Sequence, residues 1–343
     1  MDEKPAESRA MNAPVPENPE QRVLRTSREP CTHVSDAEVH EALTRDPADC
    51  FAHMLQALHD VAEGRLALDL PPKQVFGDPG TDSDFRIMPC IVRGNGNVTK
   101  TVKLVGTNIA QRKVQDQITV GKALVIDPVE NFVTHIVDAC LLSSARTGLC
   151  AAISMHLLAR RRSRLTVIGS GRVGYYAALY ATAACGIREV VFADRDPVRA
   201  EAAAAALSAR TPGCASRAAA VGELPDTDIV VLATNSNRPL CAPPAWQADL
   251  VISLGADIDH QSELDTRWAG TADIFVDTPD SARFGDLRDW IARSLIGEDD
   301  LTDLGTLLRR GAAQGDGRPR LFVSTGSALF DNLALQYLLR RLR

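Results

Sequence analysis

Cysteine-based sites are the first thing that this chain lacks. Its eight cysteines include no Cys-x-x-Cys pair and no grouping with histidine at zinc-ligand spacing, so we expect no metal. Neither a Gly-x-Ser-x-Gly turn nor a His-Glu-x-x-His helix is present, which leaves serine hydrolysis and zinc hydrolysis without support. Cys140, Cys150 and Cys185 lie in apolar stretches and are predicted to be small buried hydrophobes. Cys90 follows the Met88-Pro89 motif and is a candidate for lining a pocket rather than for a nucleophile.

Positive net charge and long apolar runs are also missing. The formal net charge of −6 gives no reason to expect nucleic acid or an anionic membrane as a partner. No apolar run approaches the roughly 20 residues that span a bilayer. The polar, Pro-rich residues 1–30 lack the apolar stretch of a signal peptide and are predicted to form a disordered tail. We therefore expect a cytoplasmic protein.

The chain is long enough, and contains enough hydrophobic residues, to form more than one hydrophobic core. The chain has 343 residues, of which 45% are hydrophobic. A single core rarely grows beyond about 250–300 residues, so two domains are expected.

The most informative segment is residues 165–194. A β-branched strand leads into Gly169-Ser-Gly171-Arg-Val-Gly174, which opens a helix, and a second strand ends at Asp194, twenty residues after the last glycine. The glycines suit a tight turn, close approach of a pyrophosphate and close helix–strand packing, and the helix N-terminus attracts phosphate. A carboxylate at Asp194 would accept the ribose hydroxyls and repel a 2′-phosphate, which favours NAD over NADP. Arg195 leaves some room for NADP, and a glycine turn without a ligand is the alternative. The expected cofactor contacts are Gly169, Ser170, Gly171, Arg172, Val173, Gly174, Asp194 and Arg195.

Secondary-structure patterns divide the chain into two kinds of organisation. In the first half, helices at about 34–43 and 47–65 precede strand-like segments at 85–92, 99–106, 122–127 and 132–138, and a long apolar helix covers 139–160. Ser35 and Glu38 have the spacing of a capping box. After residue 165, short buried strands alternate with helices, as in a parallel sheet. The fold class is therefore α/β, a doubly wound Rossmann sheet joined to an α+β domain.

Polar residues follow two of the buried strands. Ligands of open α/β sheets bind beyond the carboxyl ends of the strands, which selects Thr234, Asn235 and Ser236 after one strand and Leu254 and Gly255 after the next. These five residues are expected to line the cofactor, although the first three could equally form a plain polar loop. Asp257 would face the nicotinamide cleft, where partial desolvation tunes a carboxylate for proton transfer. A solvated loop acid is the alternative.

Three cations stand out in apolar segments of the first half, namely Arg86, Lys103 and Arg146. Because Lys and Arg are rarely buried unpaired, the three could form an anion pocket for a substrate carboxylate. For any one of them alone, snorkelling or a structural ion pair is the better interpretation.

In their order along residues 34–343, a series of motifs resembles the ornithine cyclodeaminase/mu-crystallin family. The motifs are Met88-Pro89, Lys103-Leu-Val-Gly106, Ile118-Thr119-Val-Gly121, Asp127-Pro128, Leu142-Ser-Ser-Ala-Arg146-Thr147, the 169–174 loop, Ser253-Leu-Gly-Ala-Asp257, Glu263-Leu-Asp265 and Ser324-Thr-Gly-Ser-Ala-Leu-Phe-Asp331. The resemblance implies a substrate-binding and dimerisation domain over 31–145 with 326–343, and a Rossmann domain over 146–325. A homodimer and a small amino- or imino-acid substrate are implied as well.

The same resemblance assigns roles to individual residues. It implies that Lys103 and Arg146 hold the substrate carboxylate. A second cation of the family's clamp falls near Lys73, where many members carry arginine, so Lys73 is expected to bind substrate as well. Lys103 and Asp257 are the expected catalytic residues, Asp257 in proton or amine chemistry. Thr147 is expected to approach the cofactor phosphates, and Thr119 is counted among the cofactor-binding residues.

One departure from the family pattern concerns the substrate. Ornithine cyclodeaminases carry a glutamate two residues before Met-Pro, where this chain has Arg86, which would repel a second ammonium and attract an anion. The Asp127 and Leu142 motifs look nearer to the siderophore-pathway branch, which makes a diaminopropionate precursor from an amino acid and a serine-derived unit. Ketimine reductases similar to mu-crystallin lack an equivalent of Asp257.

The expected activity is oxidation of the Cα–N bond of a small L-amino acid with NAD, giving an imine that is cyclised, hydrolysed or coupled to a second amino acid. Imino-acid reduction and amino-acid dehydrogenation are alternatives. A non-catalytic NAD(P)H-binding protein is the alternative of another class.

Overall fold

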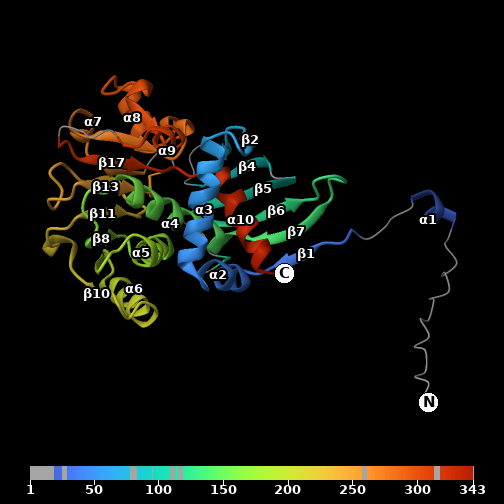
Figure 1. Cartoon of the computed structure of the whole chain (residues 1–343), viewed down its shortest axis with the longest axis horizontal. Helices are drawn as coiled ribbons and strands as arrows, with labels where there is room; N and C mark the ends of the chain where they lie inside the picture. The colour runs from blue at the N-terminus through green and yellow to red at the C-terminus, as the bar shows by residue number, and fades with distance from the viewer. Residues whose placement is uncertain are drawn as a thin grey trace, which may run out of the picture.

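The computed structural model describes residues 19–24, 29–77, 83–94, 96–108, 113–114, 119–256, 261–312 and 317–342. Two β-sheets dominate it, with helices between and around them (Figure 1). Most of the expected tail, residues 1–18 and 25–28, lies outside this description. Within residues 1–30 the structure has a short helix, α1 (Pro19–Leu24).

The first sheet is mixed and has the strand order β1-β7-β6-β5-β4-β2, with β3 also paired to β4. Strands β4, β5, β6 and β7 pair antiparallel in succession, and β1 is parallel to β7. Their bounds are β1 (Thr32–Val34), β2 (Ala67–Asp69), β3 (Gln74–Gly77), β4 (Ser83–Gly94), β5 (Asn97–Asn108), β6 (Thr119–Ile126) and β7 (Val133–Asp138). The four strands expected from sequence are thus confirmed, whereas the short strands β1, β2 and β3 were not predicted.

The second sheet is parallel throughout, in the order β10-β9-β8-β11-β13-β17-β15-β16. The predicted Rossmann sheet is confirmed. Its strands are β8 (Arg164–Ile168), β9 (Glu189–Ala193), β10 (Ala215–Ala218), β11 (Ile229–Leu232), β13 (Leu250–Ser253), β15 (Asp273–Val276), β16 (Leu301–Asp303) and β17 (Arg320–Val323). A separate parallel pair is formed by β12 (Asn237–Cys241) and β14 (Ser262–Leu264).

Side-chain caps mark the starts of the first two long helices. Ser35 and Glu38 form the expected capping box of α2, and Asp46 caps α3 ahead of Pro47. The α-helices are α2 (Asp36–Thr44), α3 (Pro47–Ala62), α4 (Ala139–Leu158), α5 (Arg172–Ala184), α6 (Pro197–Arg210), α7 (Trp268–Thr271), α8 (Gly285–Ala292), α9 (Leu304–Arg310) and α10 (Ala328–Arg341). Three 3₁₀ turns are described, η1 (Val221–Glu223), η2 (Pro279–Arg283) and η3 (Glu298–Asp300).

Helix α4 corrects one expectation from the sequence. By length and composition alone it could cross a membrane, so the statement that no apolar run approaches a membrane span was wrong. Most of its side chains are buried inside the protein, including Leu149, Cys150 and Ile153. This is the pattern of a central core helix.

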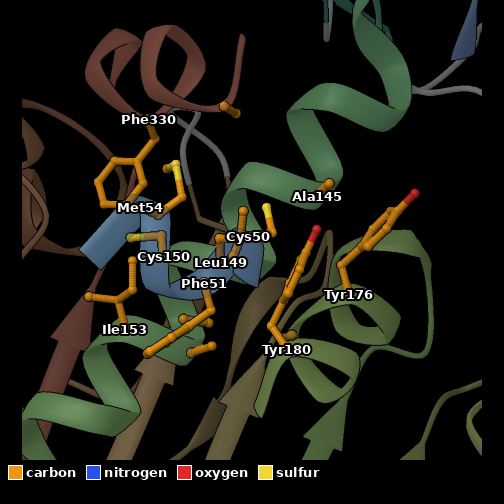
Figure 2. Close-up of a cluster of buried hydrophobic side chains, with 14 of the residues drawn as sticks. Cys50, Phe51, Met54, Ala145, Leu149, Cys150, Ile153, Tyr176, Tyr180 and Phe330 are labelled. Atoms are coloured by element: carbon orange, nitrogen blue, oxygen red, sulfur yellow. The ribbon is translucent and has the colours of Figure 1, made fainter. Parts of the chain in front are cut away.

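Four helices meet at one buried apolar cluster between the two sheets. Figure 2 shows Phe51 and Met54 of α3, Leu149 of α4, Tyr180 of α5 and Phe330 of α10 turned toward one another. The last helix therefore follows the Rossmann strand β17 in sequence but packs against the helices and strands of the first sheet. This return places residues of α10 beside residues of β5 and α4.

Candidate functional site

The glycine-rich loop lies at the carboxyl end of β8. Gly169 has a φ of +98°, and a Cβ there would lie 2.3 Å from the carbonyl oxygen of Ala233. At Gly174 a Cβ would lie 2.2 Å from the carbonyl oxygen of Gly169, so both glycines are required by the packing of the protein itself. Gly171 differs, because no heavy atom lies within 4 Å of its Cβ position. It is an exposed N-cap residue of α5, so the space in front of the helix N-terminus fits a dinucleotide pyrophosphate.

Asp194 is held against this loop. The backbone N–H of Ser170 donates a hydrogen bond of 2.8 Å to its Oδ2, and that of Asp196 donates one of 3.0 Å to its Oδ1. The carboxylate is therefore fixed beside the glycine turn, with part of its surface accessible. This position is compatible with the role expected of Asp194 in binding a ribose diol.

A buried carboxylate, Glu263 of β14, joins the two loops that follow β11 and β13. Its Oε1 accepts hydrogen bonds from N–H and Oγ1 of Thr234, at 2.8 and 2.7 Å. Its Oε2 accepts from Oγ of Ser253 at 2.7 Å and from N–H of Gly255 at 2.9 Å. Burial raises the pKa of Glu263, and these four bonds oppose the rise because they favour the ionised form. Glu263 thus positions both polar loops at the carboxyl edge of the parallel sheet.

The candidate substrate clamp brings together Lys103 of β5, Arg146 of α4 and Asp331 of α10. Lys103 Nζ donates a hydrogen bond of 2.9 Å to Asp331 Oδ1 and lies 2.8 Å from Oδ2. Arg146 Nε lies 3.0 Å from Asp331 Oδ1. All three residues are buried, with relative exposures of 2%, 6% and 2% in that order. Two cations thus share one carboxylate in a site from which water is largely excluded.

Burial also changes the proton affinity of this cluster. It lowers the pKa of Lys103 to about 7, helped by the charge of Arg146 and opposed by Asp331, and Arg86 lowers it further. Lys103 is therefore able to gain or lose a proton near neutral pH. This property fits the expected catalytic role.

Lys73 and Arg146 flank a single peptide unit, Thr325–Gly326. Lys73 Nζ donates a hydrogen bond of 2.6 Å to the carbonyl oxygen of Thr325 and lies 3.6 Å from the centre of the Phe284 ring. A Cβ on Gly326 would lie 3.0 and 3.1 Å from the two Nη atoms of Arg146. Lys73 also lines an open hollow of about 600 Å³, a volume in the range of small-molecule sites. The loop after β17 therefore shapes the clamp.

The loop after β17 is itself held by a buried carboxylate, Asp277. Its Oδ2 accepts hydrogen bonds from Ser324 Oγ at 2.7 Å and from the N–H of Gly326 at 3.2 Å, and its Oδ1 accepts from Ser281 Oγ at 2.5 Å. Ser324 also donates its backbone N–H to the carbonyl oxygen of Ser253, at the end of the neighbouring strand β13. The clamp and the cofactor loops are thus adjacent at one edge of the sheet.

Arg86 points from β4 into the same buried region and is already paired. Its Nε donates to Asp84 Oδ1 at 2.9 Å and its Nη2 to Asp84 Oδ2 at 3.1 Å, a fork-shaped pair. The residue is 5% exposed, and its charge reaches Lys103. The structure brings Arg86 near Lys103, and its pairing with Asp84 was not indicated by the sequence.

The remaining predicted residues differ in their burial and in the contacts that they make. Thr147 is buried on α4 next to Arg146 and donates its hydroxyl to the carbonyl oxygen of Ser143 at 2.8 Å. Thr119 begins β6, and its carbonyl oxygen contacts Cys140 Sγ, near the start of α4. Cys90 is buried, and burial raises the pKa of its thiol to about 12, which argues against a nucleophile.

Asp257, the expected proton-transfer residue, lies outside the described residues. The other predicted cofactor residues are Arg172 and Val173, partly buried at the start of α5; Arg195 and Asn235, exposed; Ser236, partly buried; and Leu254, buried.

Sequence reasoning gave no role to three buried carboxylates at this edge, Glu263, Asp277 and Asp331. Two of them, Glu263 and Asp331, stood inside the family-like motifs. The available signal was an acid beside an apolar strand or within an apolar helix, since such an acid requires partners. The cationic partner Lys103 of Asp331 lies 228 positions away in the sequence, whereas Glu263 and Asp277 also have partners within ten positions.

With this geometry in hand, comparison with known proteins identifies the family. The family model of the ornithine cyclodeaminase/mu-crystallin family matches residues 32–343. The chain belongs to this family, and the resemblance found in the sequence is confirmed.

Curated relatives within this family catalyse several different reactions. The chain is 29% identical over 299 residues to a Delta(1)-pyrroline-2-carboxylate reductase from Paracoccus denitrificans, covering 83% of this chain and 91% of the relative. It is 28% identical to an L-lysine cyclodeaminase from Streptomyces rapamycinicus, with coverage of 80% and 81%. It is 25% identical to an alanine dehydrogenase from Archaeoglobus fulgidus, with coverage of 84% and 91%.

Solved structures share the whole architecture. A Thermococcus litoralis Delta(1)-pyrroline-2-carboxylate reductase, in complex with NADH and L-proline, superposes with a TM-score of 0.79 at 16% identity, over 90% of this chain and 97% of that one. An archaeal alanine dehydrogenase dimer with bound NAD has a TM-score of 0.77 at 22% identity, over 91% and 95%. At these identities the likeness shows the fold, which is the predicted Rossmann-type α/β fold.

Proposed function

We propose that this chain is an NAD-dependent enzyme that interconverts a small L-amino acid and its imine at the Cα–N bond. The observation that carries the proposal is the buried pair of cations, Lys103 and Arg146, at the same sheet edge as the glycine loop. Burying two cations is costly unless an anion compensates them, and Asp331 supplies only one negative charge. One further carboxylate, that of an amino or imino acid, would complete the balance.

Residues of the parallel sheet are the proposed cofactor site. The N-terminus of α5 and the open space at Gly171 would accept the pyrophosphate, and Asp194 would accept the ribose hydroxyls. Asp194 favours NAD over NADP because it would repel a 2′-phosphate. When bound, NAD supplies hydride transfer, and the protein supplies position and proton transfer.

Clamp residues are the proposed substrate site. Lys103 and Arg146 would hold the α-carboxylate by charge-assisted hydrogen bonds, and Lys73 would extend the positive wall toward the open hollow. In the oxidative direction the substrate loses a proton from nitrogen and a hydride from Cα, which leaves an imine. Asp257 is the proposed acceptor of that proton, and Lys103 a second titratable group.

The relatives are named for different fates of the imine. The clamp and the cofactor site described above are compatible with each of these fates. Cyclisation, hydrolysis, coupling to a second amino acid, and the reverse reduction all begin from the same intermediate. Relatives named as a cyclodeaminase, an imine reductase and a dehydrogenase have similar identities to this chain. A non-catalytic NAD(P)H-binding protein is the second candidate, and the intact clamp speaks against it.

The decisive test is a substrate screen. The protein is incubated with NAD and each proteinogenic amino acid or ornithine, with and without phosphoserine, and with NADH and cyclic or acyclic imines, and products are identified by mass spectrometry. Turnover in either direction is the expected result. No turnover of any amino or imino acid, together with measurable NAD(P)H binding, would favour the non-catalytic candidate.

We also propose a cytoplasmic location.

We further propose a homodimer that forms through the outer face of the first sheet. On this face Phe85 is 52% exposed, Phe76 is 44% exposed and Leu104 is 40% exposed, and the two phenylalanine rings stack 4.8 Å apart. Apolar groups of this size usually mark an interface. Light scattering should give the mass of a dimer, and a stable monomer at micromolar concentration would contradict the proposal.

A further inference from the structure

We propose that Asp331 is the positioning residue of the substrate clamp, setting both the geometry of Lys103 and Arg146 and the net charge that they present. This inference rests on the proposed function, because it takes the two cations as the carboxylate site. Asp331 would not touch the reacting atoms; it would act through the two cations.

The first support is the way in which the clamp is assembled. Lys103 comes from the first sheet, Arg146 from the helix between the sheets, and Asp331 from the last helix. Of the three, only Asp331 contacts both of the others, at 2.8–3.0 Å. Without it, two like charges would face each other in a buried space, and nothing else among the described contacts joins them.

The second support is charge balance around Lys103. Facing it are Asp331 from α10, Arg146 from α4 and Arg86 from β4, and Arg86 is paired with Asp84. The Arg86–Asp84 pair adds no net charge, so Lys103, Arg146 and Asp331 together carry one positive charge when the lysine is protonated. The carboxylate of Asp331 favours that protonated state, whereas burial and both arginines oppose it.

The third support is unused hydrogen-bonding capacity inside the clamp. In the part of the chain that the structure describes, the buried atoms Arg146 Nε and Asp331 Oδ2 have no hydrogen-bond partner. They lie close to charges of opposite sign, but the angles are unsuitable for hydrogen bonds. Buried polar atoms are nearly always paired, so the Nε donor of Arg146 keeps hydrogen-bonding capacity that no described residue satisfies. A carboxylate accepting from Arg146 would satisfy the donor, and Asp331 would keep the guanidinium turned toward it.

The test measures binding and needs no turnover. The probe is cyclopentanecarboxylate, which has a carboxylate but no amine to oxidise, and its neutral control is cyclopentanecarboxamide. Calorimetric titration of the NAD-saturated protein from pH 5 to pH 9 gives the dissociation constant of each. The wild type should bind the carboxylate below the pKa of Lys103 and lose affinity as the pH rises through it, whereas binding of the amide should not follow this profile.

Two variants separate positioning from a merely structural role. In Asp331→Asn the negative charge is lost, so the pH at which carboxylate affinity falls should move down by roughly one to two pH units, the size expected from one charge-assisted hydrogen bond. In Asp331→Glu the charge is kept but displaced by one methylene. The pH midpoint should then stay near that of the wild type, while affinity falls at least fivefold.

Asp286→Asn is the matched control. Asp286 is also a buried carboxylate, but its partners are Ser262 Oγ and the N–H groups of Glu263 and Leu264, all uncharged. This variant should leave the pH midpoint unchanged.

The outcomes are distinguishable. A wild-type midpoint in Asp331→Asn, or full affinity in Asp331→Glu, would overturn the inference and leave the proposed function standing. A wild-type protein that binds no carboxylate at any pH would overturn both. If Asp331→Asn does not fold, Asp331→Glu decides, because it keeps the buried charge.

Discussion

Alanine at Gly326 is expected to weaken the substrate clamp without affecting the cofactor site. Gly326 has a φ of +86°, and a Cβ there would stand 3.0 and 3.1 Å from the Nη atoms of Arg146. A non-glycine residue at positive φ costs about 1–2 kcal/mol, which should appear as lost stability. The crowded guanidinium must also move by a few tenths of an ångström, which misaligns it with a bound carboxylate.

The size of the binding effect follows from the interaction that is disturbed. A hydrogen bond to a charged group contributes about 1.5–3 kcal/mol, and losing about half of it weakens carboxylate binding roughly four- to twelvefold. NAD affinity should not change, because the glycine loop and Asp194 lie on other strands of the sheet.

Gly64→Ala is the matched control for backbone strain. Gly64 has a φ of +75°, and no heavy atom lies within 4 Å of its Cβ position. Urea denaturation should therefore show a similar stability loss in both variants. Titration with cyclopentanecarboxylate should show weaker binding only in Gly326→Ala. If the two variants bind the carboxylate equally well, then the contact between Gly326 and Arg146 does not determine carboxylate binding, and the reasoning is refuted.

Four further predictions test the roles proposed above. Replacing Lys103 or Arg146 by methionine should reduce kcat/KM for the amino acid at least about tenfold, with NAD affinity nearly intact by fluorescence titration; an equal loss of NAD binding would count against a clamp. Asp257→Asn should lower kcat while sparing substrate binding, since it removes a base, and an effect confined to KM would reassign the residue. Asp194→Ser should lower the preference for NAD over NADP, and tighter NADP binding by the wild type would contradict the cofactor assignment. Arg86→Glu should favour diamino acids such as ornithine over acidic ones, and equal effects on acidic, neutral and basic substrates would make Arg86 structural.

The sequence by itself determined the fold class and the local geometry of the glycine-rich loop. Local geometry dictates a glycine loop: Gly169 and Gly174 are required by backbone contacts within one strand–turn–helix unit, and Asp194 follows at a fixed spacing. The capping box of Ser35 and Glu38 is also local, so it too could be predicted. Buried strands are recognisable because each must be apolar along its own length.

Only the tertiary structure decided how the substrate clamp is built. Lys103 and Asp331 are 228 positions apart in the sequence, and they meet because α10 returns from the parallel sheet to the first sheet. No local pattern reports which acid neutralises Lys103, and the hydrogen bonds from Thr234 to Glu263 and from Ser324 to Asp277 were hidden for the same reason. Local periodicity specifies helices and strands, whereas the charge balance of a buried site is a property of the completed packing.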